Sequence, residues 1–254
     1  FVFQVNYEFL PILQEPTQNI DDDKIIEGKS YCENGFAGIY PCNGYDLLSR
    51  IPLEYFESVE GNDSWGWTDS FDGKEYALMG LDDGTAFVDI SDPEVPLYLG
   101  KLPSASVNSS WRDIKVYEDY AFIVSEASGH GLQVFDLSKL RSVKTQQTFD
   151  SDLNFNAFGN AHNIAINKES GFAYVLGSKL FDGGPAFIDI NSPLNPSIVG
   201  GYSFSSYTHD AQVVKYHGSD TRFKEKEILF GSNSVGGENN QLIILDVTDK
   251  KNPE

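Results

Sequence analysis

Four aspartates each end a run of β-forming residues and begin a short polar turn, and this repeat is the strongest constraint on the fold of the chain. It recurs about every fifty residues, a spacing at which each copy can hold one small antiparallel sheet. The copies read Ala-Phe-Val-Asp-Ile-Ser-Asp at 86–92, Leu-Gln-Val-Phe-Asp-Leu-Ser at 132–138, Ala-Phe-Ile-Asp-Ile-Asn-Ser at 186–192 and Leu-Ile-Ile-Leu-Asp-Val-Thr at 242–248. They predict an all-β fold, a β-propeller of four-stranded antiparallel blades.

Each copy has the same internal order, which predicts where the blades lie. A first strand with alternating apolar residues is followed by two nearly continuous apolar runs, as in strands buried between neighbouring sheets. The predicted blades cover approximately 64–104, 110–150, 160–204 and 207–254, after an extended arm at 1–30, a cysteine loop at 31–44 and an outer strand at 45–55. The fourth copy lacks its outer strand. Either 45–55 supplies that strand, or, as we expect, the chain is part of a larger propeller.

The charge of the chain excludes some partners. Lys and Arg number 18 against 38 Asp and Glu, a formal net charge of -20. Such a surface repels nucleic acid and anionic lipid headgroups. No run approaches the roughly 20 apolar residues of a membrane span, so we expect no direct span in this chain. The excess of acidic residues indicates either cation binding or a highly soluble protein surface in an extracellular setting.

The two cysteines favour an oxidising compartment. Cys32 and Cys42 lie close together, without a His or third Cys to complete a zinc set. A disulfide is the favoured reading and two free thiols the alternative. The Asn-X-Ser sequons at Asn62 and Asn108 are candidate glycosylation sites. We therefore expect an extracellular or cell-surface protein.

The residues that open each blade form the main candidate site, because the first strand of a propeller blade lines the central channel. The central-channel candidates are Asp69, Arg112, Asp113, His162, Asn163, His209 and Asp210. Of these, the possible metal ligands are Asp69, Asp113, His162, His209 and Asp210. Carboxylates suit calcium, and added imidazole suits zinc or manganese. The alternative, which we favour, is a structural network of turns and ion pairs, so no cofactor is certain and a divalent cation such as calcium stays open.

Other polar or aromatic groups have simpler explanations. The loop with Ser125, Glu126, Ser128, His130 and Gln133 invites a catalytic reading, but no Gly-x-Ser-x-Gly elbow accompanies it. The aspartates that end the third strands are predicted to form turns. Trp65, Trp67 and Trp111 favour packing between blades, with carbohydrate stacking as the alternative.

Several of these motifs also resemble a known family. The blocks are Trp-Gly-Trp-Thr-Asp at 65–69, Trp-Arg-Asp-Ile-Lys at 111–115, Gly-Leu-Gln-Val-Phe-Asp-Leu at 131–137, His-Asn-Ile at 162–164 and Thr-His-Asp-Ala-Gln at 208–212. They are similar to the choice-of-anchor B family of secreted or surface-anchored proteins built from LVIVD-type repeats, from about Cys32 to Pro253. The resemblance implies a β-propeller, export and further repeats. It implies no activity for any residue.

Three functions follow as hypotheses. The favoured one is a non-enzymatic structural, adhesive or interaction module of the cell surface or an extracellular appendage, with other subunits or its own copies as partners. The second is a metal-dependent hydrolase or lyase in the channel, which requires the imidazoles of His162 and His209 to approach a common point. The third is a carbohydrate- or peptide-binding propeller.

Overall fold

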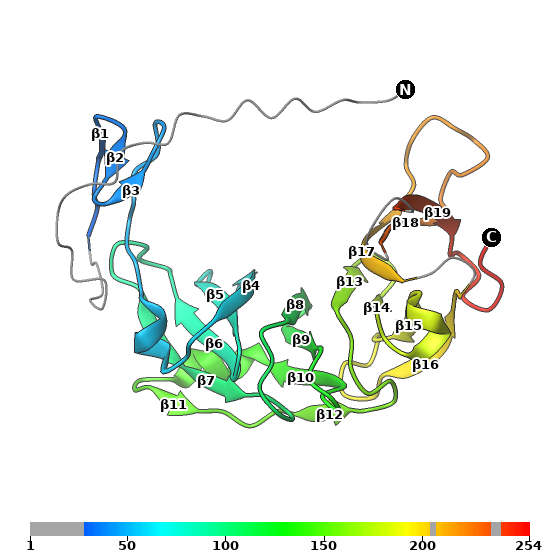
Figure 1. Cartoon of the computed structure of the whole chain (residues 1–254), viewed down its shortest axis with the longest axis horizontal. Helices are drawn as coiled ribbons and strands as arrows, with labels where there is room; N and C mark the ends of the chain where they lie inside the picture. Colours follow the sequence, from blue (N-terminus) through cyan, green and yellow to red (C-terminus); the bar gives the residue numbers. More distant parts are fainter. Residues whose placement is uncertain (1–27, 204–206, 235–239) are drawn as a thin grey trace.

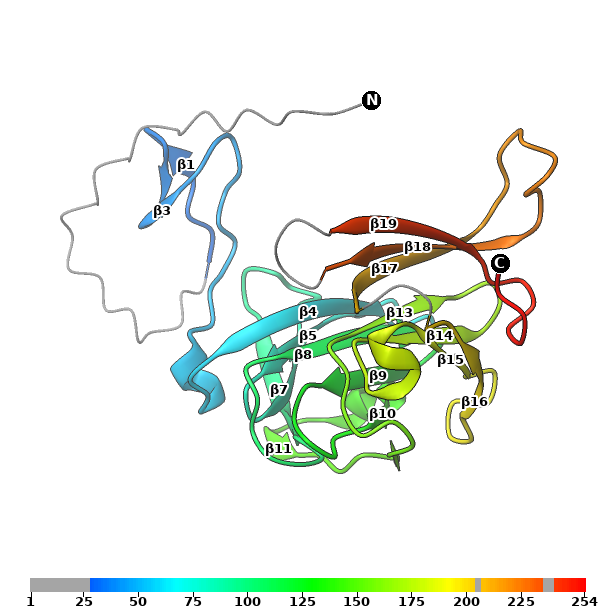
Figure 2. The ribbon, with the colours of Figure 1, turned by 45° about the vertical axis from the view of Figure 1, so that its right-hand side comes forward.

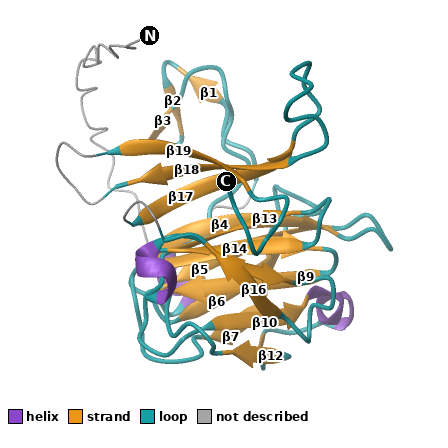
Figure 3. Cartoon of the chain, turned by 90° about the vertical axis from the view of Figure 1, so that its right-hand side faces the viewer, coloured by secondary structure: helices purple, strands orange, loops and turns teal. Residues whose placement is uncertain are grey.

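Four of the five β-sheets in the described residues lie side by side in an arc, as Figure 1 shows for the computed structural model. The structure describes residues 28–203, 207–234 and 240–254. Within those residues the regular secondary structure is chiefly strand, joined by turns and loops, with three short 3-10 helices, η1 (Leu53–Phe56), η2 (Leu137–Ser142) and η3 (Leu180–Gly183) (Figure 3). The predicted all-β propeller of antiparallel blades is confirmed.

Each of these four sheets is one blade, with its strands in chain order. Blade one holds β4 (Gly61–Thr68), β5 (Glu75–Leu81), β6 (Gly84–Asp89) and β7 (Leu97–Pro103), with β11 (Gln147–Thr148) parallel to β7. Blade two holds β8 (Arg112–Tyr117), β9 (Tyr120–Ser125), β10 (Leu132–Asp136) and β12 (Leu153–Phe155). Blade three holds β13 (Asn163–Asn167), β14 (Phe172–Leu176), β15 (Ala186–Asp189) and β16 (Ser197–Gly201). Blade four holds β17 (Thr208–Lys215), β18 (Glu227–Asn233) and β19 (Gln241–Asp246).

The first strand of every blade lies on the inner side of the arc. Strand β8 contacts both β4 and β13, and β13 contacts β17 (Figure 2). These four inner strands therefore form the channel wall, as expected for a propeller.

The core lies between the blades, which explains the continuous apolar runs. In β9, Ala121 and Ile123 pack towards blade one, whereas Phe122 and Val124 pack towards blade three. Successive side chains of a strand point to opposite faces, so a strand covered on both sides must be apolar throughout.

The repeated aspartates form turns, which confirms that prediction. Each accepts a hydrogen bond from the backbone N–H two residues later, at 2.9 to 3.1 Å. The four acceptors are Asp89, Asp136, Asp189 and Asp246. A carboxylate that bonds its own backbone in this way stabilises an Asx turn.

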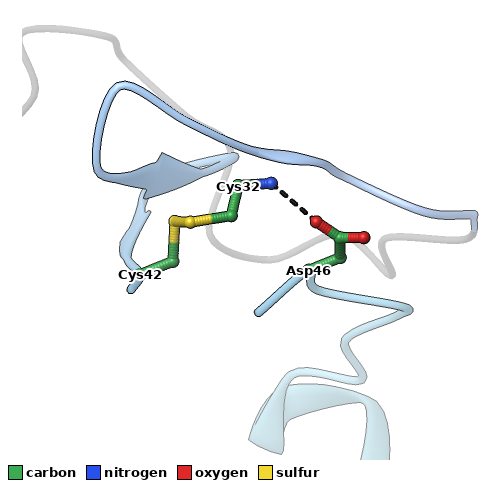
Figure 4. Close-up of a disulfide and its surroundings, with 3 residues drawn as sticks. All are labelled: Cys32, Cys42 and Asp46. Atoms are coloured by element: carbon green, nitrogen blue, oxygen red, sulfur yellow. Dashed lines mark hydrogen bonds between the residues drawn. A yellow bond between two sulfur atoms is a disulfide. The ribbon is translucent and has the colours of Figure 1, made fainter. Parts of the chain in front are cut away.

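A small unit precedes the blades. Strands β1 (Cys32–Glu33), β2 (Phe36–Ala37) and β3 (Tyr40–Pro41) form a separate three-stranded sheet. A Cys32–Cys42 disulfide closes it, and the Cys32 N–H donates to Asp46 Oδ1 at 2.9 Å (Figure 4). The predicted disulfide is confirmed.

The segment 45–55, expected as an outer strand, has a different structure. It holds an isolated bridge between Ser30 and Leu47 and the start of η1, and it contributes no strand to a blade. Of the expected arm at 1–30, residues 1–27 lie outside the described part of the chain.

Candidate functional site

Four polar residues near the start of the inner strands line one hollow in the channel wall, with a volume of about 400 Å³. They are Asp63, Asp113, Asn163 and Asp210. Three of them were predicted from the sequence. Asp63 occupies the channel position that was predicted for Asp69, so the prediction of Asp69 as a channel residue is wrong.

The strand boundaries explain why this prediction is wrong. Strand β4 begins at Gly61 and ends at Thr68, so residues 65–68 of the Trp-Gly-Trp-Thr-Asp motif form its second half and Asp69 follows its end. A better signal was the pair of polar residues that opens each inner strand. The pairs are Asn62-Asp63, Arg112-Asp113, His162-Asn163 and His209-Asp210.

Asp69 lies at the other end of the strand and has a structural role. Its buried carboxylate accepts hydrogen bonds from Arg141 Nε at 2.6 Å and Nη2 at 2.8 Å, and from the Phe71 N–H at 2.8 Å. The hydrogen bonds from Arg141 lower the pKa of Asp69. The same guanidinium contacts Asp119 in the β8–β9 turn, so Asp69 joins blade one to blade two far from the channel acids.

The polar side chains of the channel wall connect each blade to the next. Asp63 Oδ2 accepts the Ile114 N–H at 3.0 Å, and Asp113 Oδ2 accepts the Ile164 N–H at 2.7 Å. Asn163 Nδ2 donates to the His209 carbonyl at 2.8 Å. These inter-blade hydrogen bonds support the structural reading of the repeat. Asp210 accepts a hydrogen bond from its own neighbour, the Ala211 N–H, at 2.7 Å.

A lysine provides positive charge beside two of these acids. Lys115 Nζ donates to Asp113 Oδ1 and lies 3.8 Å from Asp63 Oδ2. Burial, followed by the hydrogen bond with Asp63, raises the pKa of Asp113 to about 7. In the described part of the chain no three His, Cys, Asp or Glu side chains gather as a metal site. The calcium hypothesis therefore stays a prediction without a ligand cluster behind it.

The two channel histidines do meet. His162 Nε2 and His209 Nε2 are 2.9 Å apart, and Glu126 Oε1 lies 2.7 Å from His162 Nδ1. The rings of Trp111 and Tyr207 flank His162, with centroids 5.9 and 6.0 Å away. Glu126 comes from the β9–β10 loop, and its contact with His162 was not predicted.

Arg112 turns away from the channel. Its Nε donates to the Leu81 carbonyl at 2.9 Å, and its Nη1 lies 2.9 Å from His130 Nε2. Burial lowers the pKa of Arg112 to about 10, and burial followed by the Arg112 charge lowers the pKa of His130 to about 4. Both side chains are buried between blades one and two.

The loop around Glu126 does not form a catalytic triad. Ser125 Oγ donates to the Trp111 carbonyl at 2.7 Å, and Gln133 Nε2 donates to the Pro103 carbonyl at 2.9 Å. His130 is committed to Arg112, so none of these contacts pairs a serine with a histidine. The loop contributes Glu126 to the histidine pair and otherwise stabilises the blade interface.

The three tryptophans differ in burial. Trp67 is buried and stacks on Tyr76 with ring centroids 5.0 Å apart, whereas Trp65 and Trp111 are 36% and 52% exposed.

The two asparagines of the glycosylation sequons both make hydrogen bonds. Asn62 Oδ1 accepts the Arg112 N–H at 2.9 Å, and Asn108 Nδ2 donates to Asp82 Oδ2 at 3.3 Å. Glycosylation at these two asparagines stays a prediction.

Comparisons with known proteins support the fold. Residues 110–146, in blade two, match the family model of the LVIVD repeat. No curated protein matches the chain. Hydrazine synthase from Kuenenia stuttgartiensis is structurally similar over 71% of this chain, with a TM-score of 0.51 and 14% identity. An alpha-L-arabinofuranosidase from Clostridium thermocellum matches over 70% of the chain, with a TM-score of 0.43 and 13% identity.

The similarity to hydrazine synthase, at 14% identity, shows the fold alone. The chain spans 45% of the hydrazine synthase chain and 66% of the arabinofuranosidase chain. The chain is thus a β-propeller with one segment, residues 110–146, that matches the LVIVD repeat. No helix of the described residues has the length and apolar character needed to cross a membrane.

Proposed function

We propose that the chain is an extracellular, non-enzymatic interaction module, and that the outer face of blade four is the surface through which it assembles. The disulfide and the LVIVD repeat support an extracellular location. The inter-blade hydrogen bonds of Asp63, Asp113 and Asn163 support a structural role for the channel wall. The proposal rests mainly on the apolar face of blade four.

The residues of this face occupy the same positions as residues of blade two that are buried against blade three. In blade two, Val134 lies two residues before Asp136 and pairs with Phe122, and both side chains are completely covered by blade three. In blade four, Ile244 lies two residues before Asp246 and pairs with Phe230. Ile244 is 59% exposed, and its neighbour Leu242 is 66% exposed.

The chemistry of the face specifies its partner. Ile228, Phe230 and Ile244 line an apolar hollow of about 460 Å³ together with Tyr216 and Phe223. In blade two the equivalent face is covered by the small aliphatic side chains Ala173, Val175 and Ile188 of blade three. The partner is therefore another blade with such a face, and Asp210 would accept its backbone N–H as Asp63 and Asp113 do.

A second copy of the chain has a related face in blade one, part of which is covered by Ile51, Leu53 and Phe56 of its own chain. In blade one, Ala77 pairs with Val88, as Ala173 pairs with Ile188 in blade three. Met79 lies beside them, and the three side chains border an apolar hollow of about 510 Å³. In a longer polypeptide a following blade would cover the face of blade four; between separate copies, self-assembly would bring blade four of one copy against blade one of another.

Analytical ultracentrifugation over a range of concentrations tests the proposal. Burying each large aliphatic side chain stabilises an interface by roughly 1.5–3 kcal/mol, so the variant L242D/I244D should weaken association at least tenfold. V107D is the matched control, because Val107 is also exposed, at 66%, and lies outside blade four. A wild-type chain that stays monomeric at all concentrations, or equal weakening by V107D, would contradict the proposal.

The histidine pair favours a second candidate function, a metal-dependent hydrolase. His162 and His209 meet the geometric requirement for a shared ligand, and Glu126 orients one of them. The test is hydrolysis of ester, phosphoester and glycoside substrates in the presence of added zinc. Turnover that is absent from H162Q/H209Q would favour this function, and equal background rates in both proteins would exclude it for those substrates.

A further inference from the structure

The pair formed by His162 and His209 has the arrangement of a small metal site at the entrance of the channel. The two Nε2 atoms face each other at 2.9 Å, and the ring centroids are 4.2 Å apart. Each nitrogen can present a lone pair to the same point if both rings carry their proton on Nδ1. A metal ion would then replace the proton that the rings otherwise share.

Glu126 favours this protonation state in one of the two rings. Its carboxylate lies 2.7 Å from His162 Nδ1, so that nitrogen donates its hydrogen and Nε2 keeps the lone pair. A carboxylate behind a histidine is the usual outer contact of a metal-bound imidazole. Asn160 Nδ2 donates to the Glu126 carbonyl at 3.2 Å, and Asn163 Nδ2 holds the His209 carbonyl at 2.8 Å. The backbones of Glu126 and His209 are therefore fixed before a ligand arrives.

The chemistry of the two nitrogens indicates which metals suit the pair. The observed 2.9 Å is the length of a hydrogen bond between the two rings, and a bound ion would replace that hydrogen bond. Imidazole nitrogens are ligands for zinc, copper, iron and nickel. Tetragonal coordination by nitrogen and oxygen is typical of Cu²⁺ and Ni²⁺, and Cu²⁺ binds nitrogen ligands more tightly.

We infer that His162 and His209 bind one Cu²⁺ ion through their Nε2 atoms, with water in the remaining positions and Glu126 as the orienting carboxylate. The His162 side chain is largely covered, whereas His209 is exposed. One side of the pair is therefore open to an entering ion. The net charge of -20 attracts cations to the whole surface. The inference is independent of the assembly proposed for blade four.

The chain offers a clean test because it has four histidines. Cu²⁺ titration would be followed by calorimetry and by electron paramagnetic resonance, which counts the coordinated imidazole nitrogens. We expect one site with two nitrogens in the wild type, and at least a tenfold loss of affinity in H162Q and in H209Q. E126Q should weaken binding by about tenfold to a hundredfold while leaving both nitrogens bound.

The control is H217Q. His217 is exposed and lies near Glu225 and Glu169, away from the pair, so this variant should bind Cu²⁺ as the wild type does. Circular dichroism would confirm that every variant folds, and the exposed His209 provides a substitution that the fold tolerates. Wild-type binding by H162Q and H209Q, loss of binding in H217Q, or a single coordinated nitrogen in the wild type would each overturn the inference.

Discussion

At the scale of single residues, Glu227 shows how a buried charge can join two blades. Its carboxylate accepts hydrogen bonds from Asn167 Nδ2 at 2.6 Å, Tyr174 OH at 2.7 Å and Ser170 Oγ at 2.7 Å, all from blade three, and it pairs with Lys250 Nζ at 2.7 Å. Burial alone would raise the pKa of Glu227. The hydrogen bonds from Lys250, Ser170, Tyr174 and Asn167 outweigh burial, so the pKa is lowered.

This balance predicts the effect of E227Q. The glutamine amide of E227Q cannot form the ion pair with Lys250, and its NH₂ group would face the hydrogen-bond donors that surround the carboxylate. The variant should therefore lose about 2–4 kcal/mol of unfolding free energy at neutral pH. A lowered pKa means that the ionised carboxylate stabilises the fold above its unfolded pKa of about 4.5, and that this contribution disappears as the pH falls below it.

Urea unfolding of both proteins from pH 7 to pH 3 tests this prediction. The difference between them should shrink across the acidic end of the range. E225Q is the control, because Glu225 is exposed and pairs with Lys215 on the surface. An E227Q penalty that stayed constant with pH would contradict the assignment.

At the scale of elements, two glycines allow the backbone of one blade to pack closely against the fourth strand of the preceding blade. Gly100, with φ of +139°, and Gly200 lie opposite β-bulges in blades one and three. A Cβ at Gly100 would overlap the carbonyl of Gln147, and one at Gly200 would overlap the carbonyl of Lys250. In both cases the segment after a third strand runs along the fourth strand of the preceding blade.

We therefore expect G100A and G200A each to reduce the unfolding free energy by about 2–3 kcal/mol, because the neighbouring backbone must move. Chemical denaturation of the purified variants measures the loss. G66A is the matched control: Gly66 lies in β4, and an added Cβ there would come no closer than 4.0 Å to its nearest neighbour, the Tyr76 carbonyl. Equal losses in all three variants would show that the close approach is not the cause.

The sequence predicted the elements better than it predicted the start of each inner strand. Apolar runs and Asx turns mark the second and third strands directly, since both signals are local. The start of β4 is less visible, because a register shift lies between Gly61 and Ser64 and moves Asp63 relative to its partners. Glu126 and His162 belong to different blades, so the contact between them cannot be predicted from a local sequence pattern.

At the scale of the whole molecule, the disulfide unit is separate from the blades. Its strands β1 to β3 contact chiefly one another, and Figure 1 shows them beyond the end of the arc. The connections of its neighbouring residues to blade one include hydrogen bonds from the Gly28 N–H to the Glu94 carbonyl and from Ser49 Oγ to the Pro93 carbonyl.

Reduction of Cys32–Cys42 should therefore loosen this unit and leave the blades folded. Closing so short a loop is worth about 2–3 kcal/mol in the chain-entropy model, and that energy acts on the local sheet. Hydrogen exchange with and without reductant should show faster exchange at residues 30–47, while the thermal midpoint of the blades stays unchanged. A lower midpoint in reductant would show that the unit supports the propeller.

The hydrogen bonds along the channel also have a direction. Asp63 and Asp113 each accept an N–H group from the blade that follows, so these inter-blade hydrogen bonds form only after the next inner strand is in place. A ribosome delivers the blades in that same order. Each blade can therefore serve as a template for its successor, and a chain halted during synthesis would expose the apolar face that the next blade covers in the folded protein.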